Sequence, residues 1–262
     1  MVSIRIILLL CLSGFITACQ GSHSAPTDNT QQTSGQQAAN DQADANELAP
    51  PRPKSEVAKI NAQLGLAYLE QNNVQRAKIK LLMALKQSPE SPEPWYSMAY
   101  FLEATGNYAE ARKHYEKAVE VAPQRGDAQN NYGTFLCRAG QYQESIKHFM
   151  LAANTPDYLD PAAAYENAGL CSMNMKAYKQ ASGYFNQALL KDPARTLSLL
   201  KLAEVEAKLG NTDQAKNLLT QYALVAPATD ESMKLKNELD KVAVKRAAKP
   251  AIALSTNLPV KS

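Results

Sequence analysis

A period of 34 residues constrains this chain more than any other feature of its sequence. One copy runs from a small residue through a bulky residue, an alanine, a second bulky residue and a second alanine to a proline. In the first copy these residues are Gly65, Tyr68, Ala77, Leu81, Ala84 and Pro89. In the second copy they are Ala99, Leu102, Ala111, Tyr115, Ala118 and Pro123. A chain that repeats in this way folds as a row of similar units, each packed on its neighbours.

Three further copies follow. The third keeps Gly133, Leu136, Ser145, Phe149 and Ala152, but its proline comes one residue early, at Pro156, and two extra residues follow around Asp160. The fourth has Gly169, Ala181, Phe185, Ala188 and Pro193, and the fifth has Ala203, Ala215, Leu219, Tyr222 and Pro227. Period and pattern resemble the tetratricopeptide repeat, a helical hairpin. The predicted repeats are residues 58–91, 92–125, 126–159, 162–195 and 196–229.

The residue types explain why each copy forms a hairpin. A small residue in the first helix lets the second helix approach closely, and bulky residues fill the gaps between neighbouring hairpins. A proline after the second helix stops it, and Gly106, Gly140 and Gly210 mark turns between the two helices. The predicted fold class is therefore an all-α tetratricopeptide-repeat superhelical solenoid.

The chain after the fifth repeat predicts a capping helix and a tail. Asp230 can cap a helix over residues 230–248. Met233, Leu235, Leu239 and Val242 form an apolar side of this helix, and lysines and acidic residues form a side exposed to water. Such a helix can cover the last repeat and keep it soluble. Residues 249–262 contain two prolines and are predicted to be disordered. The repeat domain with its cap spans residues 55–248.

The first residues predict export and lipidation. Arg5 precedes an apolar run, Ile6 to Ile16, which is too short to span a bilayer and is typical of a signal peptide over residues 1–18. The run ends in Ile-Thr-Ala-Cys, which resembles a bacterial lipobox with Cys19 as the acylated residue. An ordinary signal peptide, with Cys19 as a free thiol, is the alternative. In such lipoproteins an aspartate after the cysteine favours inner-membrane retention, and Gln20 therefore implies the outer membrane, facing the periplasm.

Residues 19–54 carry almost no large apolar side chain. They are rich in Gln, Ser, Thr, Asn, Asp and Ala, and such a segment cannot bury enough surface to offset its ordering entropy. We therefore expect a disordered tether that leads from the lipidated cysteine to the first repeat.

The sequence offers little chemistry. The 28 basic and 25 acidic residues are spread along the chain, so nucleic acid is not an expected partner. His114 and His148 occupy the same repeat position, but neither has ligands at metal spacing, and they are expected to be surface or groove-edge residues rather than a metal pair. Because no nucleotide-binding loop, nucleophile elbow or zinc-protease helix is present, neither enzyme activity nor a metal or other cofactor is expected.

Two cysteines remain in the mature chain once the signal peptide is removed and Cys19 is acylated. Cys137 and Cys171 lie near the ends of the first helices of the third and fourth repeats, which pack side by side in a solenoid. In an oxidising periplasm such a pair can form a disulfide. The alternative is two reduced cysteines that act as small buried hydrophobes.

The first helices of successive repeats line a concave groove in this architecture, and we expect a protein partner to bind there. Asparagine amides can pair with a peptide backbone, and tyrosines add apolar area with a polar tip. The alternative is a solvated polar face without a partner. The inward-facing residues are predicted to be Tyr96, Tyr100, Asn130, Asn131, Thr134, Arg138, Glu166, Asn167, Leu170 and Asn174.

Several stretches resemble one family in particular. These stretches are 131–137 (NYGTFLC), 140–142 (GQY), 156–158 (PDY) and 166–171 (ENAGLC). They are similar to the type IV pilus biogenesis and stability lipoproteins of the PilF/PilW kind. The resemblance implies a pilotin, an outer-membrane lipoprotein that helps the pilus secretin reach the outer membrane and form its multimer. The tether is longer than the family leads one to expect.

Two other function classes compete with the pilotin. One is a repeat lipoprotein that scaffolds cell-wall enzymes or outer-membrane assembly factors. The other is a hydrolase of envelope polymers, for which the sequence supplies no nucleophile, base or metal set.

Overall fold

The computed structural model describes residues 52–247, and in this range the chain forms eleven α-helices and no strand. Five hairpins are followed by one further helix. The hairpins are α2 (Lys54–Glu70) with α3 (Val74–Gln87), α4 (Pro92–Ala104) with α5 (Tyr108–Val121), α6 (Gly126–Arg138) with α7 (Tyr142–Ala153), α8 (Pro161–Asn174) with α9 (Tyr178–Lys191), and α10 (Thr196–Lys208) with α11 (Thr212–Val225). The last helix is α12 (Asp230–Ala247). The prediction of an all-α solenoid is confirmed.

Four predictions lie outside the described residues. They are the signal peptide, the lipidated Cys19, the tether before the first hairpin and the tail over residues 249–262. The chain from Arg52 onward forms a compact unit by itself. Its buried core is divided into clusters that follow the hairpins in chain order.

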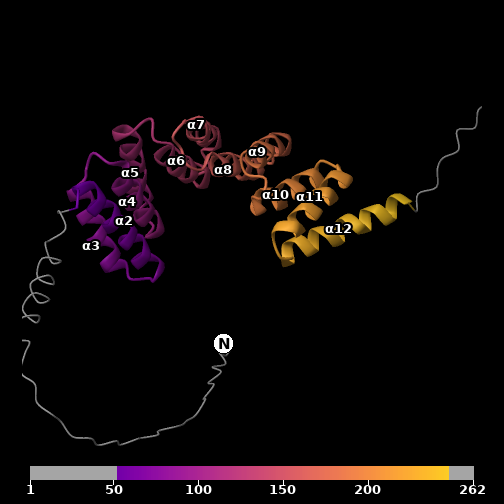
Figure 1. Cartoon of the computed structure of the whole chain (residues 1–262), viewed down its shortest axis with the longest axis horizontal. Coiled ribbons are helices and arrows are strands. Elements are labelled where there is room, and N and C mark those ends of the chain that lie inside the picture. The colour runs from indigo at the N-terminus through magenta and orange to yellow at the C-terminus, as the bar shows by residue number, and fades with distance from the viewer. Residues whose placement is uncertain (1–51, 248–262) are drawn as a thin grey trace, which may run out of the picture. The chain divides into compact units, whose positions relative to one another are not determined.

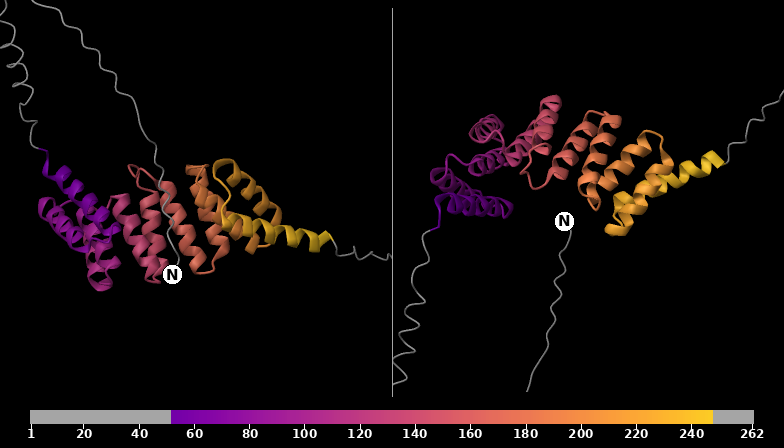
Figure 2. Two further views of the ribbon diagram at one scale, coloured as in Figure 1. Left: turned by 90° about the horizontal axis from the view of Figure 1, so that it is seen from below. Right: turned by 45° about the horizontal axis from the view of Figure 1, so that its top comes forward.

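Each hairpin contacts the one that follows it (Figure 1). The first helix of a hairpin packs against both helices of the preceding one, as α4 does against α2 and α3. Two further views show the same succession from other sides (Figure 2). Because contacts run almost entirely between neighbours, the fold is held together locally, as expected of a solenoid.

Small residues in the first helices hold the two helices of a hairpin close together. A Cβ on Gly65 would lie 2.6 Å from Cγ of Leu81. A Cβ on Gly169 would lie 2.7 Å from Cε1 of Phe185, in the fourth hairpin. These bulky partners are fully buried. The small-to-bulky pairing predicted from the 34-residue pattern therefore forms the contact within the hairpins.

The turns and helix ends follow the predicted punctuation. In three hairpins the residue between the two helices is a glycine with positive φ, such as Gly106 at 82°. This backbone conformation is costly for residues with a Cβ. The first and fourth hairpins place Asn72 and Lys176 there instead. In four hairpins the second helix ends two residues before the predicted proline, as α3 does at Gln87, whereas α7 ends three residues before Pro156.

The junction between the third and fourth hairpins carries the two extra residues. The loop between α7 and α8 folds back so that Tyr158 packs over Gly126, the first residue of α6. A Cβ on Gly126 would lie 2.5 Å from the Tyr158 ring, and burial raises the pKa of Tyr158 to about 12. Asp160 then caps α8 by accepting a hydrogen bond from the Ala163 amide at 2.9 Å. The loop with the two extra residues thus packs on the start of α6 and caps α8.

Candidate protein-binding surfaces

The ten predicted groove residues lie on α4, α6 and α8. These are the first helices of the second, third and fourth hairpins, and each contacts the next. The structure therefore brings the ten residues onto neighbouring helices. It also gives most of their polar groups partners within the chain, which the sequence did not predict.

Tyr96 on α4 faces α6. Its hydroxyl donates to a carboxylate oxygen of Asp127 at 3.4 Å, and Asn131 donates to the Asp127 carbonyl oxygen at 2.9 Å. Burial, and then the charge of Asp127, raise the pKa of Tyr96. Asp127 also accepts two hydrogen bonds from Arg125. Asp127 was not among the predicted site residues. It stands at the start of a first helix, where the helix dipole stabilises acidic side chains.

Arg138 at the end of α6 pairs with Glu103 at the end of α4. The guanidinium donates two hydrogen bonds, of 2.6 and 2.7 Å, to the two carboxylate oxygens of Glu103. Tyr115 also donates to Glu103, at 3.2 Å. Nearby Tyr100 on α4 is 48% exposed. Among the predicted residues, Tyr100 and the half-exposed Arg138 are the ones that present large side chains to a partner.

The asparagines are joined to one another. Asn167 on α8 donates to the side-chain oxygen of Asn130 on α6 at 3.0 Å, so one amide pair links two hairpins. Thr134 donates to the Asn130 carbonyl oxygen at 2.8 Å. Asn174 is exposed, with its amide nitrogen 3.9 Å from the Cys137 sulfur, and Leu170 packs beside the core of the fifth hairpin.

Glu166 departs from the prediction that it faces the groove. It is buried, with 7% exposed, and accepts a hydrogen bond of 2.8 Å from Ser198 on α10. Its other carboxylate oxygen lies 3.1 Å from Nε of Arg195, an ion pair without hydrogen-bond alignment. A buried carboxylate needs such partners because desolvation penalises its charge. Glu166 therefore fastens the fourth hairpin to the fifth instead of meeting a ligand.

The structure brings the sulfur atoms of Cys137 and Cys171 into contact with each other, with the Cα atoms 5.8 Å apart. They lie near the ends of α6 and α8, where sequence analysis placed them. Both cysteines are buried beside Ile146 and Phe149. A disulfide at this place would join the first helices of neighbouring hairpins covalently.

The two repeat-related histidines lie in different surroundings. Nδ1 of His148 lies 2.6 Å from the side-chain oxygen of Gln129, and its ring meets that of Tyr132 edge-on at 4.7 Å. Burial lowers the pKa of His148. His114 lies beside Trp95, with ring centroids 5.6 Å apart. Within residues 52–247 no cluster of three metal-ligating side chains is present.

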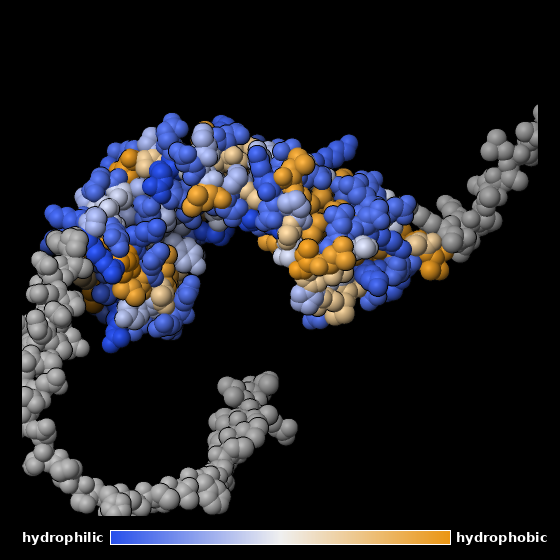
Figure 3. Space-filling view, in the orientation of Figure 1, coloured by the Kyte–Doolittle hydropathy of each residue, from blue (hydrophilic) through white to orange (hydrophobic). Residues whose placement is uncertain are grey.

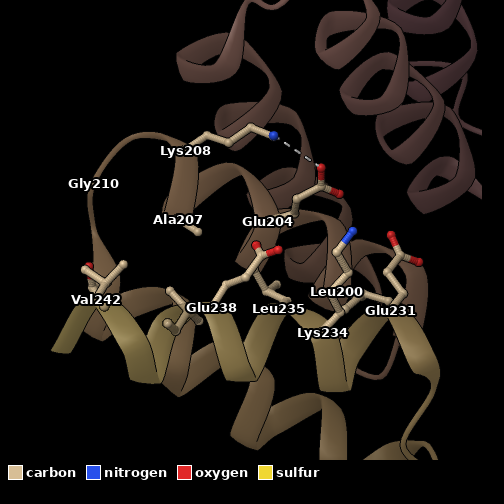
Figure 4. A pocket seen from close by; sticks show the side chains of 12 residues that line it. Leu200, Glu204, Ala207, Lys208, Gly210, Glu231, Lys234, Leu235, Glu238 and Val242 are labelled. Carbon is tan, nitrogen blue, oxygen red and sulfur yellow. Dashed lines mark ion pairs between the residues drawn. The ribbon is translucent and has the colours of Figure 1, made fainter. Parts of the chain in front are cut away.

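A cleft of about 500 Å³ lies between α10 and α12. Figure 4 shows that Glu231, Lys234, Glu238 and Val242 line it from α12, whereas Glu204 and Lys208 do so from α10. Lys201 binds both Glu204 and Glu231 and so ties the two helices together. The sequence predicted the cap but gave no sign of this cleft.

A second surface that sequence analysis missed is the outer face of α3, defined by Arg76, Lys78, Ile79, Leu82, Met83 and Lys86. The three apolar residues are exposed although large, with 48% of Ile79, 50% of Leu82 and 42% of Met83 accessible. Apolar and hydrophilic surface lie side by side over this N-terminal hairpin (Figure 3). The spacing of Ile79, Leu82 and Met83 places them on one helix side, a signal readable in the sequence.

None of the helices in residues 52–247 is long and apolar enough to cross a membrane.

Comparison with known proteins places these surfaces in a family context. Models of the tetratricopeptide repeat match residues 92–135 and 197–228. An uncharacterised protein of Haemophilus influenzae is 36% identical over 126 residues, which cover 47% of this chain and 70% of the relative. The type IV pilus assembly protein PilF of Pseudomonas aeruginosa is 28% identical over 162 residues, which cover 62% of this chain and 64% of PilF.

Two solved structures agree with this relationship. The structure of Pseudomonas aeruginosa PilF superposes with a TM-score of 0.66 at 27% identity, covering 75% of this chain and 88% of PilF. The structure of PilW, described as a widely conserved type IV pilus biogenesis factor, superposes with a TM-score of 0.64 at 24% identity. That match covers 73% of this chain and 88% of PilW, and it shows a common fold.

Proposed function

Because this chain belongs to the tetratricopeptide-repeat family and is a homologue of PilF, we propose that it acts in type IV pilus biogenesis as a pilotin. In this role it is an outer-membrane lipoprotein that binds the pilus secretin and promotes the secretin's localisation and multimerisation. The observation that carries the proposal is the homology to PilF, which extends over 162 residues of sequence.

The proposed place of action is the periplasmic face of the outer membrane. Lipidation at Cys19 supports this, since the lipobox puts a cysteine where acylation needs it and Gln20 follows. A disulfide between Cys137 and Cys171 fits the same compartment, because disulfides persist in the oxidising periplasm. Both modifications are therefore part of the proposal.

The polar groove on α4, α6 and α8 is the proposed contact surface for the partner. Most of its polar side chains already have partners within the chain, as Asn167 has in Asn130 and Arg138 in Glu103, so the surface is ordered before a partner arrives. Preorganisation lowers the entropy cost of binding. Tyr100 is exposed on this surface, and tyrosine is enriched among residues that contribute most to interfaces.

A scaffold for cell-wall enzymes or outer-membrane assembly factors is the second candidate, because repeat solenoids serve generally as binding surfaces. We propose no enzymatic role: tetratricopeptide-repeat proteins act in general as scaffolds.

The test compares secretin multimers in a strain that lacks this gene, with and without complementation. Heat-resistant secretin multimers should disappear on gels of the outer membrane and return with the wild-type gene. Complementation with Cys19→Ala should leave the protein in the soluble periplasmic fraction and restore few multimers. Normal multimers and pili together with cell-wall defects in the deletion strain would instead favour the scaffold.

A further inference from the structure

The charge of α3 sets it apart from the second helix of the next hairpin. Arg76, Lys78, Lys80 and Lys86 are its four charged residues, and none is acidic. The corresponding helix α5 has three acidic residues and three lysines or arginines. The second helix α9 has two lysines and no acidic residue, and α7 and α11 each have one lysine and one acidic residue. With four positive charges, α3 therefore has the largest excess among the second helices.

These basic side chains are left without acidic partners. Among the described residues, none of the four takes part in an ion pair, and the Arg76 guanidinium lies over the Tyr68 ring at 5.7 Å from its centroid. In the next hairpin, by contrast, Lys113 pairs with Glu110 and Lys117 with Glu120. The positive field of α3 is thus not compensated within residues 52–247.

The same helix side carries the exposed apolar residues. Ile79, Leu82 and Met83 lie opposite Ala77 and Leu81, which are buried against the rest of the repeat domain. Lys78 and Lys86 are exposed and stand among the apolar residues on the helix surface. No described helix covers this side: α3 contacts only α2 and α4, as the next second helix, α5, contacts only α4 and α6.

We propose that the outer face of α3 docks on an anionic phospholipid surface. Exposed apolar side chains interspersed with lysine and arginine are what an interfacial helix presents to lipid: the apolar groups enter the headgroup boundary and the cations meet phosphate. An acidic protein would satisfy the cations as well. The lipid is favoured because this hairpin is the first to follow the predicted lipidated cysteine, which brings it to a bilayer.

Docking gives the first hairpin a defined contact with the membrane in addition to the lipid anchor. The acyl chains would hold the protein at the membrane, and a basic patch adds attraction to anionic lipid. The inference does not depend on the pilus role, because a lipoprotein scaffold would dock in the same way.

The experiment uses the chain from Gln20 onward, which has no lipid and retains the self-contained repeat unit. Its sedimentation with vesicles of phosphatidylcholine containing 30% phosphatidylglycerol is compared with pure phosphatidylcholine vesicles. We expect binding to the anionic vesicles that weakens in high salt, because salt screens exposed charges. A lysine near such a surface contributes about fivefold in binding, so K78E/K86E should lose roughly 25-fold or more. The apolar variant L82S/M83S should also bind less.

The matched control is K147E/K179E, which makes the same change in net charge at exposed lysines of two other second helices. It should bind almost as wild type, and circular dichroism should show all three variants folded. Equal losses in K78E/K86E and the control would overturn the proposal, since net charge alone would then explain binding. Failure of the wild-type chain to bind anionic vesicles would overturn it too, and loss of secretin multimers in α3 variants would then assign the face to a protein.

Discussion

At its C-terminal end the row of hairpins is closed by α12, whereas at its N-terminal end the outer face of α3 has no described helix over it. Leu235 and Leu239 of α12 are buried against the fifth hairpin, and Lys216 on α11 binds Asp240 at 2.8 Å. Leu82 and Met83 of α3 stay about half exposed. A solenoid needs a polar cap at a free end. The leucines that α12 turns to its neighbours are therefore buried, whereas the apolar residues on the outer face of α3 are available for contact, as the lipid-docking proposal requires.

The largest effect should come from removing the apolar contacts of the cap. L235A/L239A truncates two buried leucines and should lower the free energy of unfolding by about 4 kcal/mol or more. The matched pair L82A/M83A at the open end should cost about 1 kcal/mol or less, because these side chains are exposed. Urea unfolding followed by circular dichroism measures both. Equal losses of unfolding free energy in the two variants would contradict the expected difference between the two ends.

A smaller effect should follow from cutting the link between the third and fourth hairpins. The Cys137–Cys171 pair closes a loop with a sequence separation of 34. In the chain-entropy model such a link stabilises the folded state by about 3 to 4 kcal/mol, so reduction should lower the melting temperature. Thiol titration of the unfolded, unreduced mature protein should find neither cysteine free. Two free thiols there would rule out the disulfide.

The smallest effect concerns the pH dependence of stability and comes from His148 on α7, midway between the two ends. Burial lowers its folded pKa below that of the unfolded chain. The unfolded state therefore takes up the proton first as pH falls, and stability present above the unfolded value, about 6.5, is lost on acidification. His148→Gln should reduce the fall in melting temperature between pH 7 and pH 5. Identical pH profiles for His148→Gln and wild type would contradict this.

Much of the fold could be predicted because it depends on local spacing. Gly169 and Phe185 belong to the same hairpin, and their contact brings its two helices together. A proline two residues after the end of α9 also belongs to that hairpin. The 34-residue period carries that information directly. The period also showed where the cap begins, because the repeat pattern ends at Pro227 and a new helix begins at Asp230.

The surfaces could be predicted only in part because side-chain partners come from other hairpins. The sequence placed Glu166 on a first helix, but its burial depends on Ser198 and Arg195, which belong to the next repeat. The pairing of Arg138 with Glu103 likewise depends on how far two hairpins are rotated. The exposed side of α3 was readable in the sequence, because the spacing of Ile79, Leu82 and Met83 puts them on the helix side opposite the repeat alanines.

Whether this chain binds the pilus secretin can be measured with the purified chain from Gln20 onward. The measured quantity is its affinity for detergent-solubilised secretin. We expect saturable binding, with Tyr100→Ala about 30-fold weaker, since a hot-spot loss of about 2 kcal/mol corresponds to that factor. Leu190→Ala, which removes an exposed apolar side chain from α9 outside the groove, should bind as wild type. Saturable binding would support the pilotin, and no binding by a chain that circular dichroism shows to be folded would contradict it.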